Sequence, residues 1–427
     1  MNGVRIFLLG ILIFNRVIFA FELTVKADSA GKMPLYICYV KGSQQYKLPF
    51  AYRVFESDLE FMGIFDFKSE VKTAVLTKKE RKEILGKGYG LGLFLVETED
   101  VIDVYVHNML SDKTVIGKRF TKSVPARVIA HRVADTVFST LLSEPSFFLT
   151  RIAYVKEVPS HLHSFSPKRI LCVVDYDGSC EQAVIETPLA IFGPRWSSRL
   201  NVPMLFYSEH TATNIRLMTV DLQKKKKISS TVDGMTLLPC CLPNGNGVVY
   251  CSTGSNGYTQ LFLYTFEGVK QLTFYQGNSL SPSITSDGSL LYFCSDYASG
   301  TPQIFSYRFS DGMVEPITTD GYCTSPAVCQ RTGNLLYTKM VQGIMQIMLY
   351  DPKLANITQL TFDRANKDCV SWSPCGKYIL YGFESGQQQR IAMLNIVNKK
   401  TVFITPTDVR CSYPSWSPVY NHFPIFV

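Results

Sequence analysis

The chain has 427 residues, 46% of them hydrophobic and 18% charged, and a formal net charge of +8. This composition excludes an intrinsically disordered chain. The length allows two or more domains, because single hydrophobic cores usually stop growing at about 250–300 residues. The basic excess is scattered apart from Lys224–Lys227. We interpret that run as a solvated hairpin tip rather than a nucleic-acid or lipid patch, and expect no nucleic-acid partner.

Residues 1–20 have the pattern of a secretory signal. Arg5 precedes an apolar run, residues 6–14, which is too short to cross a bilayer. Polar sequence begins soon after Ala20, where we place the cleavage site. The alternative is an uncleaved membrane anchor. No later segment offers about 18 consecutive apolar residues, so we expect no membrane span in the mature chain.

The 12 cysteines all lie after this segment. None forms a CxxC pair, and no cluster of Cys and His has the spacing of metal ligands, so we predict neither a metal site nor a cofactor. Several cysteines fall at apolar strand positions and are predicted to pack in the core. In an exported protein a few disulfides are possible, for example Cys172–Cys180 across a hairpin.

A short phrase recurs along the C-terminal two thirds of the chain. Ser-Trp-Ser-Pro at residues 371–374 returns at residues 415–418. Proline, or valine in one copy, stands at positions 194, 239, 282, 326, 370 and 414, with spacings of 45, 43, 44, 44 and 44 residues. A repeat of about 40–50 residues with strand-like content is typical of propeller blades.

Each repeat is predicted to contain four strands joined by turns. In one copy, the Asp287-Gly288 turn is followed by an apolar strand at residues 291–294 and an alternating strand at residues 303–307. The first copy, residues 151–186, lacks an opening strand, whereas the last, residues 413–418, has only that strand. Together they complete one blade, so we predict a six-bladed β-propeller closed by strands from both ends of the repeat region.

Residues 21–145 lack this repeat and combine strand-like runs with a long helix that is capped by Ser123 and carries apolar residues at spacing four from Ile129 to Leu141. His131 on that helix is interpreted as structural. The predicted fold is therefore an α/β N-terminal domain followed by an all-β propeller. The predicted boundaries are 1–20 for the signal peptide, 21–145 for the α/β domain, 146–418 for the propeller and 419–427 for a tail.

Two motifs resemble those of a known family. Residues 127–138, RVIAHRVADTVF, and residues 148–155, FLTRIAYV, look like the interdomain signature of the TolB family. The segment Asp58-Leu59-x-x-x-Gly63-x-Phe65 resembles the family's DLxxSGxF motif. This sequence departs from the family pattern at Glu60, in lacking a tryptophan before the glycine-rich strand, and in blades without the full WSPDG phrase.

The resemblance implies a non-enzymatic, monomeric component of the periplasmic Tol–Pal system, which supports outer-membrane integrity and cell division. TolB-like proteins bind the lipoprotein Pal through the propeller face that carries the loops before each opening strand. They bind the inner-membrane protein TolA through their extreme N-terminal segment. The residues here that match the Pal-binding face are Asn278, Ser281, Tyr322, Thr324, Asn366, Asp368, Arg410 and Ser412, and those of the N-terminal segment are Phe21, Glu22, Leu23, Thr24 and Val25.

The alternatives are a propeller-bearing envelope protein of the peptidase type and a ligand-binding propeller unrelated to Tol–Pal. A peptidase of that type needs a G-x-S-x-G elbow and a hydrolase domain of about 200 residues. Residues 21–145 contain no such motif. We therefore predict that the protein is not an enzyme.

Overall fold

The computed structural model describes residues 5–8, 21–24, 31–41, 50–142, 144–159, 167–212, 214–224, 226–229 and 237–420. The chain divides into two compact units, Met1–Leu149 and Thr150–Phe426. Among the described residues, no helix is both long and apolar enough to cross a membrane.

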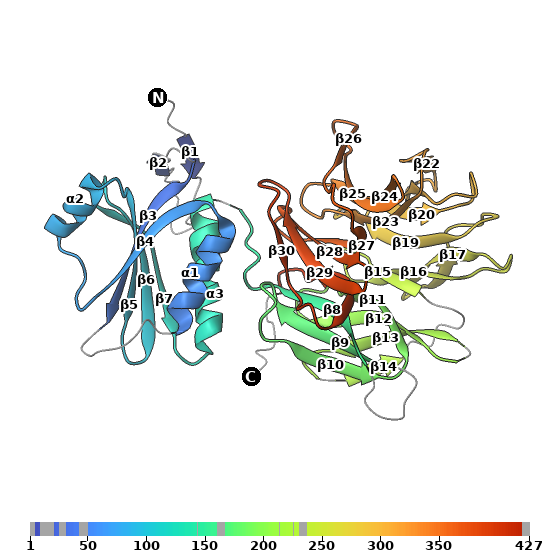
Figure 1. Ribbon diagram of the computed structural model, residues 1–427, viewed down its shortest axis with the longest axis horizontal. Coiled ribbons are helices and arrows are strands. Elements are labelled where there is room, and N and C mark those ends of the chain that lie inside the picture. Colours follow the sequence, from blue (N-terminus) through green and yellow to red (C-terminus); the bar gives the residue numbers. More distant parts are fainter. Residues whose placement is uncertain are drawn as a thin grey trace. The chain divides into compact units, whose positions relative to one another are not determined.

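The first unit is built on a five-stranded mixed sheet with three helices (Figure 1). Its strand order is β4-β3-β5-β6-β7, with β3 parallel to both neighbours and the remaining pairs antiparallel. A separate pair of short strands precedes it. The elements are β1 (Arg5–Leu8), β2 (Phe21–Thr24), β3 (Met33–Lys41), α1 (Phe50–Met62), β4 (Phe65–Lys72), α2 (Lys78–Gly86), β5 (Leu91–Glu97), β6 (Val101–Asn108), β7 (Lys113–Thr121) and α3 (Ala126–Leu142).

The interior strand β3 is apolar on both faces because helices cover both. Tyr36 and Cys38 pack with Ile84 of α2 in one buried cluster. The next side chain along, Tyr39, points to the opposite face and stacks on Tyr52 of α1, with ring centroids 4.3 Å apart. This alternation explains why the strand reads as a continuous apolar run.

Helices α1 and α3 lie side by side against the second face of the sheet (Figure 1). Between them, Nδ1 of His131 lies 2.8 Å from a carboxylate oxygen of Asp58, and both side chains are buried. Asp58 belongs to one of the two motifs noted in the sequence and His131 to the other. The motifs therefore meet in the interior of the unit, which supports a structural role for His131.

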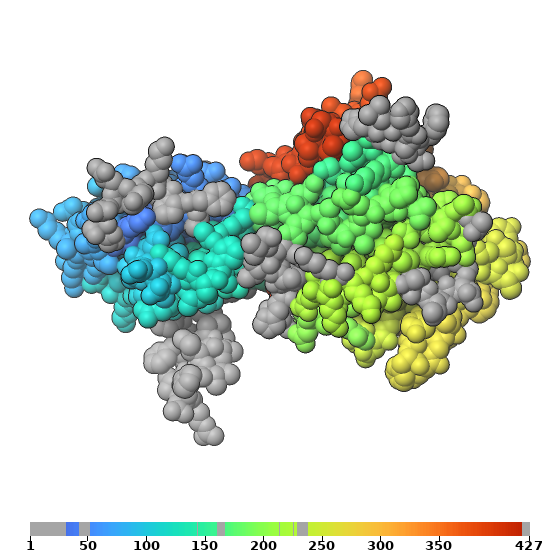
Figure 2. Space-filling view, turned by 90° about the horizontal axis from the view of Figure 1, so that it is seen from below, coloured from blue at the N-terminus to red at the C-terminus, as the bar shows by residue number. Residues whose placement is uncertain are grey.

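The second unit is a six-bladed β-propeller, which confirms the predicted fold. Each blade is an antiparallel sheet of four strands. The space-filling view shows the green, yellow-green and yellow blades following one another in chain order (Figure 2). From the innermost strand outward, the blades are: blade 1, β31 (Arg410–Trp416), β8 (Arg151–Val158), β9 (Lys168–Asp175) and β10 (Gln182–Thr187); blade 2, β11 (Ala190–Trp196), β12 (Met204–His210), β13 (Ile215–Asp221) and β14 (Lys226–Ser229); blade 3, β15 (Leu237–Cys241), β16 (Gly247–Thr253), β17 (Thr259–Thr265) and β18 (Gly268–Gln271); blade 4, β19 (Ser279–Ile284), β20 (Leu290–Ser295), β21 (Gln303–Arg308) and β22 (Val314–Pro316); blade 5, β23 (Cys323–Val328), β24 (Leu335–Val341), β25 (Ile344–Asp351) and β26 (Asn356–Gln359); blade 6, β27 (Asn366–Trp372), β28 (Tyr378–Ser385), β29 (Gln388–Asn395) and β30 (Thr401–Phe403).

The ring is closed in blade 1 as the sequence predicted. Strand β31 pairs antiparallel with β8, from Arg410 opposite Glu157 to Trp416 opposite Ile152. Beyond the ladder, the backbone N–H of Ser417 donates to the carbonyl of Arg151 at 2.8 Å. No inner strand of the ring is left without a neighbouring sheet in the described part of the chain.

The repeated phrase has a packing role that the structure makes explicit. All three tryptophans of the chain stand two residues after the proline slot. The indole N–H of Trp196 donates to the carbonyl of Ser415, and that of Trp372 to the carbonyl of Ala327, each at 2.9 Å. Each bond joins a blade to the preceding one, so Trp196 and Trp372 connect the inner strands of neighbouring sheets.

Every inner strand also contains a β-bulge, which the sequence analysis did not predict. In each, the pairing register shifts at the repeated slot. The residue just before the slot has a positive φ, a conformation that is strained for residues other than glycine. These residues are Gly193, Leu238, Ser281, Ser325, Cys369 and Tyr413, with φ between 48° and 55°.

The cysteines act mostly as packing residues. Cys251 and Cys294 occupy equivalent positions in neighbouring blades and are buried. Cys172 is a buried free thiol, so the predicted Cys172–Cys180 bridge is wrong. The reason is positional: Cys172 lies inside β9 while Cys180 is exposed in the following turn. Burial raises the pKa of Cys172, Cys251 and Cys294 to about 12, which keeps these thiols protonated.

Candidate partner-binding face

One end of the propeller carries the loops that enter the inner strands. Because the strands of each blade are antiparallel, these loops share that end with the loops between second and third strands. We call this end the entry face. The opposite end, with the turns after the inner strands and the hairpins between third and fourth strands, is called the exit face. All predicted propeller-face residues fall on or beside the entry face.

The entry loops are held by buried polar side chains. In blade 5, Gln346 donates to the carbonyl of Asp363 at 2.6 Å and accepts from the hydroxyl of Thr361 at 2.7 Å. The same hydroxyl oxygen accepts from the backbone N–H of Ile347 at 3.0 Å. Gln303 and Thr318 form the same pair in blade 4, and Gln260 bonds the equivalent loop in blade 3. Such fully bonded loops are pre-organised, which reduces the entropy lost when a partner binds.

A buried lysine performs this task at the entry to blade 6. The side chain of Lys367 is fully buried. Its ammonium group donates to a carboxylate oxygen of Asp363 at 2.5 Å, to the carbonyl of Ala365 at 2.6 Å and to Gln346 at 3.2 Å. Burial lowers the pKa of Lys367, and the Asp363 carboxylate opposes that effect. The ammonium group of Lys367 therefore holds the loop before β27 through several hydrogen bonds at once.

Two of the predicted residues have structural bonds. Asn278 and Asn366 occupy equivalent positions at the start of their inner strands. The amide oxygen of Asn278 accepts from the backbone N–H of Thr259 at 3.1 Å, and that of Asn366 from Met345 at 3.0 Å. Each side chain thus ties an inner strand to the third strand of the preceding blade.

Two further predicted residues, Asp368 on β27 and Thr324 on β23, make side-chain hydrogen bonds. A carboxylate oxygen of Asp368 accepts from the hydroxyl of Ser325 at 2.5 Å, and from the backbone N–H of Cys369 at 2.7 Å. Thr324 on β23 bonds to the hydroxyl of Thr338 at 2.9 Å. Ser281 on β19, at the position equivalent to Ser325, and Ser412 on β31, at the position equivalent to Asp368, are both half-buried.

Tyr322 and Arg410 project from the entry face. Tyr322 is 41% exposed. Arg410 is exposed, and its guanidinium lies 3.7 Å from a carboxylate oxygen of Glu157 and 3.3 Å from the amide oxygen of Gln389. Surface contacts as long as those of Arg410 contribute little stability. The Arg410 side chain can therefore turn toward a partner, and the exposed ring of Tyr322 is accessible to one.

Sequence reasoning missed an exposed aromatic pair on the same face. Phe274 is 70% exposed and Phe362 is 76% exposed, and they occupy equivalent entry loops. Tyr258 and Met340 add exposed apolar surface beside the loops between second and third strands. The signal was present as a repeated Leu-Thr-Phe triplet at residues 272–274 and 360–362.

The predicted N-terminal segment is partly described. Residues Phe21–Thr24 form β2, which pairs with Arg5–Leu8 of β1, whereas Val25 lies outside the described residues. Most of the predicted signal peptide also lies outside them. Its cleavage after Ala20 therefore stays a prediction.

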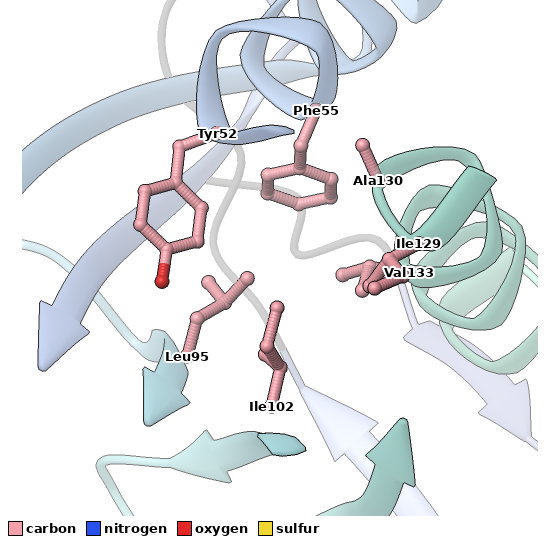
Figure 3. A pocket seen from close by; sticks show the side chains of 7 residues that line it. All are labelled: Tyr52, Phe55, Leu95, Ile102, Ile129, Ala130 and Val133. Carbon is pink, nitrogen blue, oxygen red and sulfur yellow. The ribbon is translucent and has the colours of Figure 1, made fainter. Parts of the chain in front are cut away.

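The described residues include a small pocket and no cluster of potential metal ligands. No group of three or more His, Cys, Asp or Glu side chains among them could hold a metal ion. A small pocket in the first unit is lined by Phe55, Leu95, Ile102 and Val133, with Ala130, Ile129 and Tyr52 completing the wall (Figure 3). The phenol of Tyr52, its single polar side chain, donates to Glu97 at 2.8 Å. We interpret the pocket as imperfect core packing.

Fold and face together define a β-propeller protein with an accessory α/β unit and a rigid, partly aromatic loop face. A family model described as the TolB β-propeller domain matches residues 138–420. The chain belongs to this family.

Similar proteins agree with this assignment. The chain is 29% identical over 189 residues to the Tol-Pal system protein TolB of Nitrosomonas europaea, 42% of each chain. It is 26% identical over 215 residues to that of Gluconobacter oxydans, 48% of this chain and 45% of the relative. The matches thus span less than half of these relatives. In fold, it is similar to the crystal structure of TolB from Acinetobacter baumannii, with a TM-score of 0.74 and 18% identity over 91% of this chain and 98% of the other.

Proposed function

We propose that the protein is a non-enzymatic, monomeric scaffold of a periplasmic Tol–Pal system, and that it supports outer-membrane integrity and cell division. Membership of the TolB propeller family supports assignment to a Tol–Pal system. The entry face supports the role of a binding scaffold. The observation that carries the proposal is the exposed pair Phe274 and Phe362 on loops anchored by buried hydrogen bonds. Exposed aromatic side chains on a rigid support are typical anchors of protein interfaces.

The proposed partner of the entry face is a Pal-like lipoprotein. Tyr322, Asp368 and Arg410 would supply polar contacts around the aromatic anchors, while Asn278 and Asn366 would keep the loops in place. Apolar anchors surrounded by polar groups match the usual anatomy of an interface.

The proposed partner of the N-terminal segment is a TolA-like protein. If residues 1–20 are removed on export, Phe21–Thr24 loses its pairing strand, Arg5–Leu8. Its unpaired backbone groups could then add to the edge of a partner's sheet.

Binding measurements with Pal-like and TolA-like proteins of the same genome test both assignments. The double variant Phe274→Ser/Phe362→Ser should weaken Pal-like binding by about tenfold to thirtyfold, as expected for interface anchors. Deletion of residues 21–25 should abolish TolA-like binding alone. The matched control is Leu354→Ser/Val397→Ser, which changes equally exposed residues on the exit face.

The alternative functions predict different results. A peptidase-like protein would hydrolyse peptide or ester substrates in purified form. A propeller that binds an unrelated ligand would bind neither candidate partner. Either result would contradict the proposal.

A further inference from the structure

The exit face of blades 5 and 6 combines exposed apolar side chains with exposed lysines, and one carboxylate, that of Asp351, lies at the turn between β25 and β26. Leu354 is 74% exposed at the hairpin between β25 and β26, and Val397 is 72% exposed at the hairpin between β29 and β30. Exposed lysines flank them. They are Lys353, Lys399 and Lys400, and none has a carboxylate within 4 Å among the described residues.

Both hairpin tips are rigid. The side chain of Asp351 accepts from the backbone N–H groups of Lys353 and Leu354, at 2.9 and 3.3 Å. The side chain of Asn395 accepts from Val397 at 2.9 Å in the same way. The two neighbouring blades therefore present an apolar side chain and adjacent lysines in similar turns.

The charge of this region differs from that of the opposite end. The exit-face segments of blades 5 and 6, residues 329–334, 352–355, 373–377 and 396–400, contain no Asp or Glu. Their basic residues are Arg331, Lys353, Lys377, Lys399 and Lys400. By contrast, the entry side of the same blades carries both signs of charge: Asp320, Asp363, Asp368 and Asp408 stand among Lys339, Arg364, Lys367 and Arg410, and Lys339 and Lys367 pair with Asp320 and Asp363. The exit face therefore has the charge that complements an anionic surface.

We infer that the exit face of blades 5 and 6 docks on an anionic phospholipid surface. The apolar residues stand on separate tips instead of forming the continuous area that a stable protein interface needs. Single projecting apolar side chains enter the boundary between lipid headgroups and acyl chains, while flanking lysines interact with acidic headgroups. The inference uses the face opposite to the proposed Pal-binding face and does not depend on that proposal.

Vesicle co-sedimentation tests this inference. The chain from Phe21 onward should bind vesicles containing phosphatidylglycerol, bind poorly to phosphatidylcholine alone, and dissociate as salt rises. The variants Leu354→Ser/Val397→Ser and Lys353→Ser/Lys399→Ser/Lys400→Ser should each weaken binding by at least about tenfold, since each lysine near the surface contributes about fivefold. Phe274→Ser/Phe362→Ser, on the entry face, should bind as the parent does.

Several results would overturn the inference. One is failure of the parent chain to bind phosphatidylglycerol vesicles. Another is equal loss of binding in the entry-face control. A third is salt-sensitive binding to a soluble acidic protein that equals vesicle binding and needs the same lysines, because the partner would then be a protein. Circular dichroism of each variant verifies that the fold is retained, and the Pal-like binding assay gives an independent readout.

Discussion

At the scale of single residues, charged side chains in this protein are used to hold turns. Lys367 is fully buried and bonded to the loop before β27. Asp112, in the turn between β6 and β7, has a positive φ of 52° and accepts from His107 at 3.1 Å and from Arg81 at 3.0 Å. Lys367 bonds backbone carbonyls of its loop, whereas Asp112 joins side chains of α2 and β6 at the turn.

Lys367→Met should lower the free energy of unfolding of the propeller by about 1–3 kcal/mol, because it leaves buried acceptors without their donor. Urea unfolding followed by tryptophan fluorescence measures this, since Trp196, Trp372 and Trp416 all lie in the propeller. Lys353→Met, at an exposed position, should stay within about 0.5 kcal/mol of the parent. An equally small effect at Lys367 would contradict the structural role.

The first unit should lose stability in acid through Asp112. Hydrogen bonds from His107 and then Arg81 lower the pKa of Asp112 from 3.8 to about 2. A carboxyl with a lowered folded pKa stabilises above its ordinary pKa, and this contribution is lost as the pH falls toward about 2. Asp112→Asn should therefore reduce stability at neutral pH and flatten its decline between about pH 4 and 2.

Helical circular dichroism isolates this effect, because α1, α2 and α3 all lie in the first unit. The control is Asp66→Asn, at an exposed site on β4. It should keep the pH profile of the parent. A steep acid loss that persists in Asp112→Asn would exclude this carboxyl as its source.

At the scale of elements, the inner strand is the recurring unit of the propeller. It contains a bulge just before the slot and, in three blades, a tryptophan two residues after it. The bulge turns the strand at the entry face. The indoles of Trp196 and Trp372 then donate to the inner strand of the preceding blade. The repeated motif thus sets the bend of the inner strand and, where it contains Trp196 or Trp372, bonds that strand to the neighbouring blade.

The bulge makes a prediction at Ser281, whose φ is 55°. Ser281→Val should destabilise the propeller by about 1–3 kcal/mol, because a β-branched side chain is strained at positive φ. Ser281→Gly removes that strain and should unfold at the same or higher urea concentration. Tryptophan fluorescence measures both variants. A valine variant as stable as the glycine variant would show that the bulge is not maintained at this position.

At the scale of the whole molecule, stability depends on closing the ring. Each blade buries its faces against its neighbours, so an interrupted ring would expose two sheets. The closing strand β31 is joined to β8 by a backbone ladder, and Trp416 adds a bond from its indole N–H to Thr150 at 2.8 Å. The last described residue, Tyr420, donates to the carbonyl of Ser197 in blade 2 at 2.7 Å.

A chain truncated before Arg410 should therefore lose cooperative unfolding of the propeller and become sensitive to protease. A chain that ends at Tyr420 is the matched control and should unfold like the parent. Adding a peptide of residues 410–420 to the first truncation should restore protection. Cooperative unfolding of the truncated chain without the peptide would contradict closure by β31.

The spacing of the proline slots was sufficient to predict six blades and their closure, because each repeat carries the same turn and strand pattern. Exposure of Phe274 and Phe362 was not predictable in the same way. A Leu-Thr-Phe triplet at a strand end can direct its phenylalanine inward or outward, and the choice depends on the Gln–Thr pair that holds the loop. The burial of Lys367 likewise depends on carbonyl groups that the loop brings together.

The architecture was predictable from the chain alone, since repeat period, turn residues and alternating strands are local properties of the chain. The sequence also contained both family motifs. The folded arrangement brings Asp58 and His131 of those motifs together inside the first unit, which the motifs alone did not reveal. It also decided which side chains face solvent at each end of the propeller. The physical reason is that burial and hydrogen bonding depend on neighbours from distant segments, whereas periodicity depends only on neighbours along the chain.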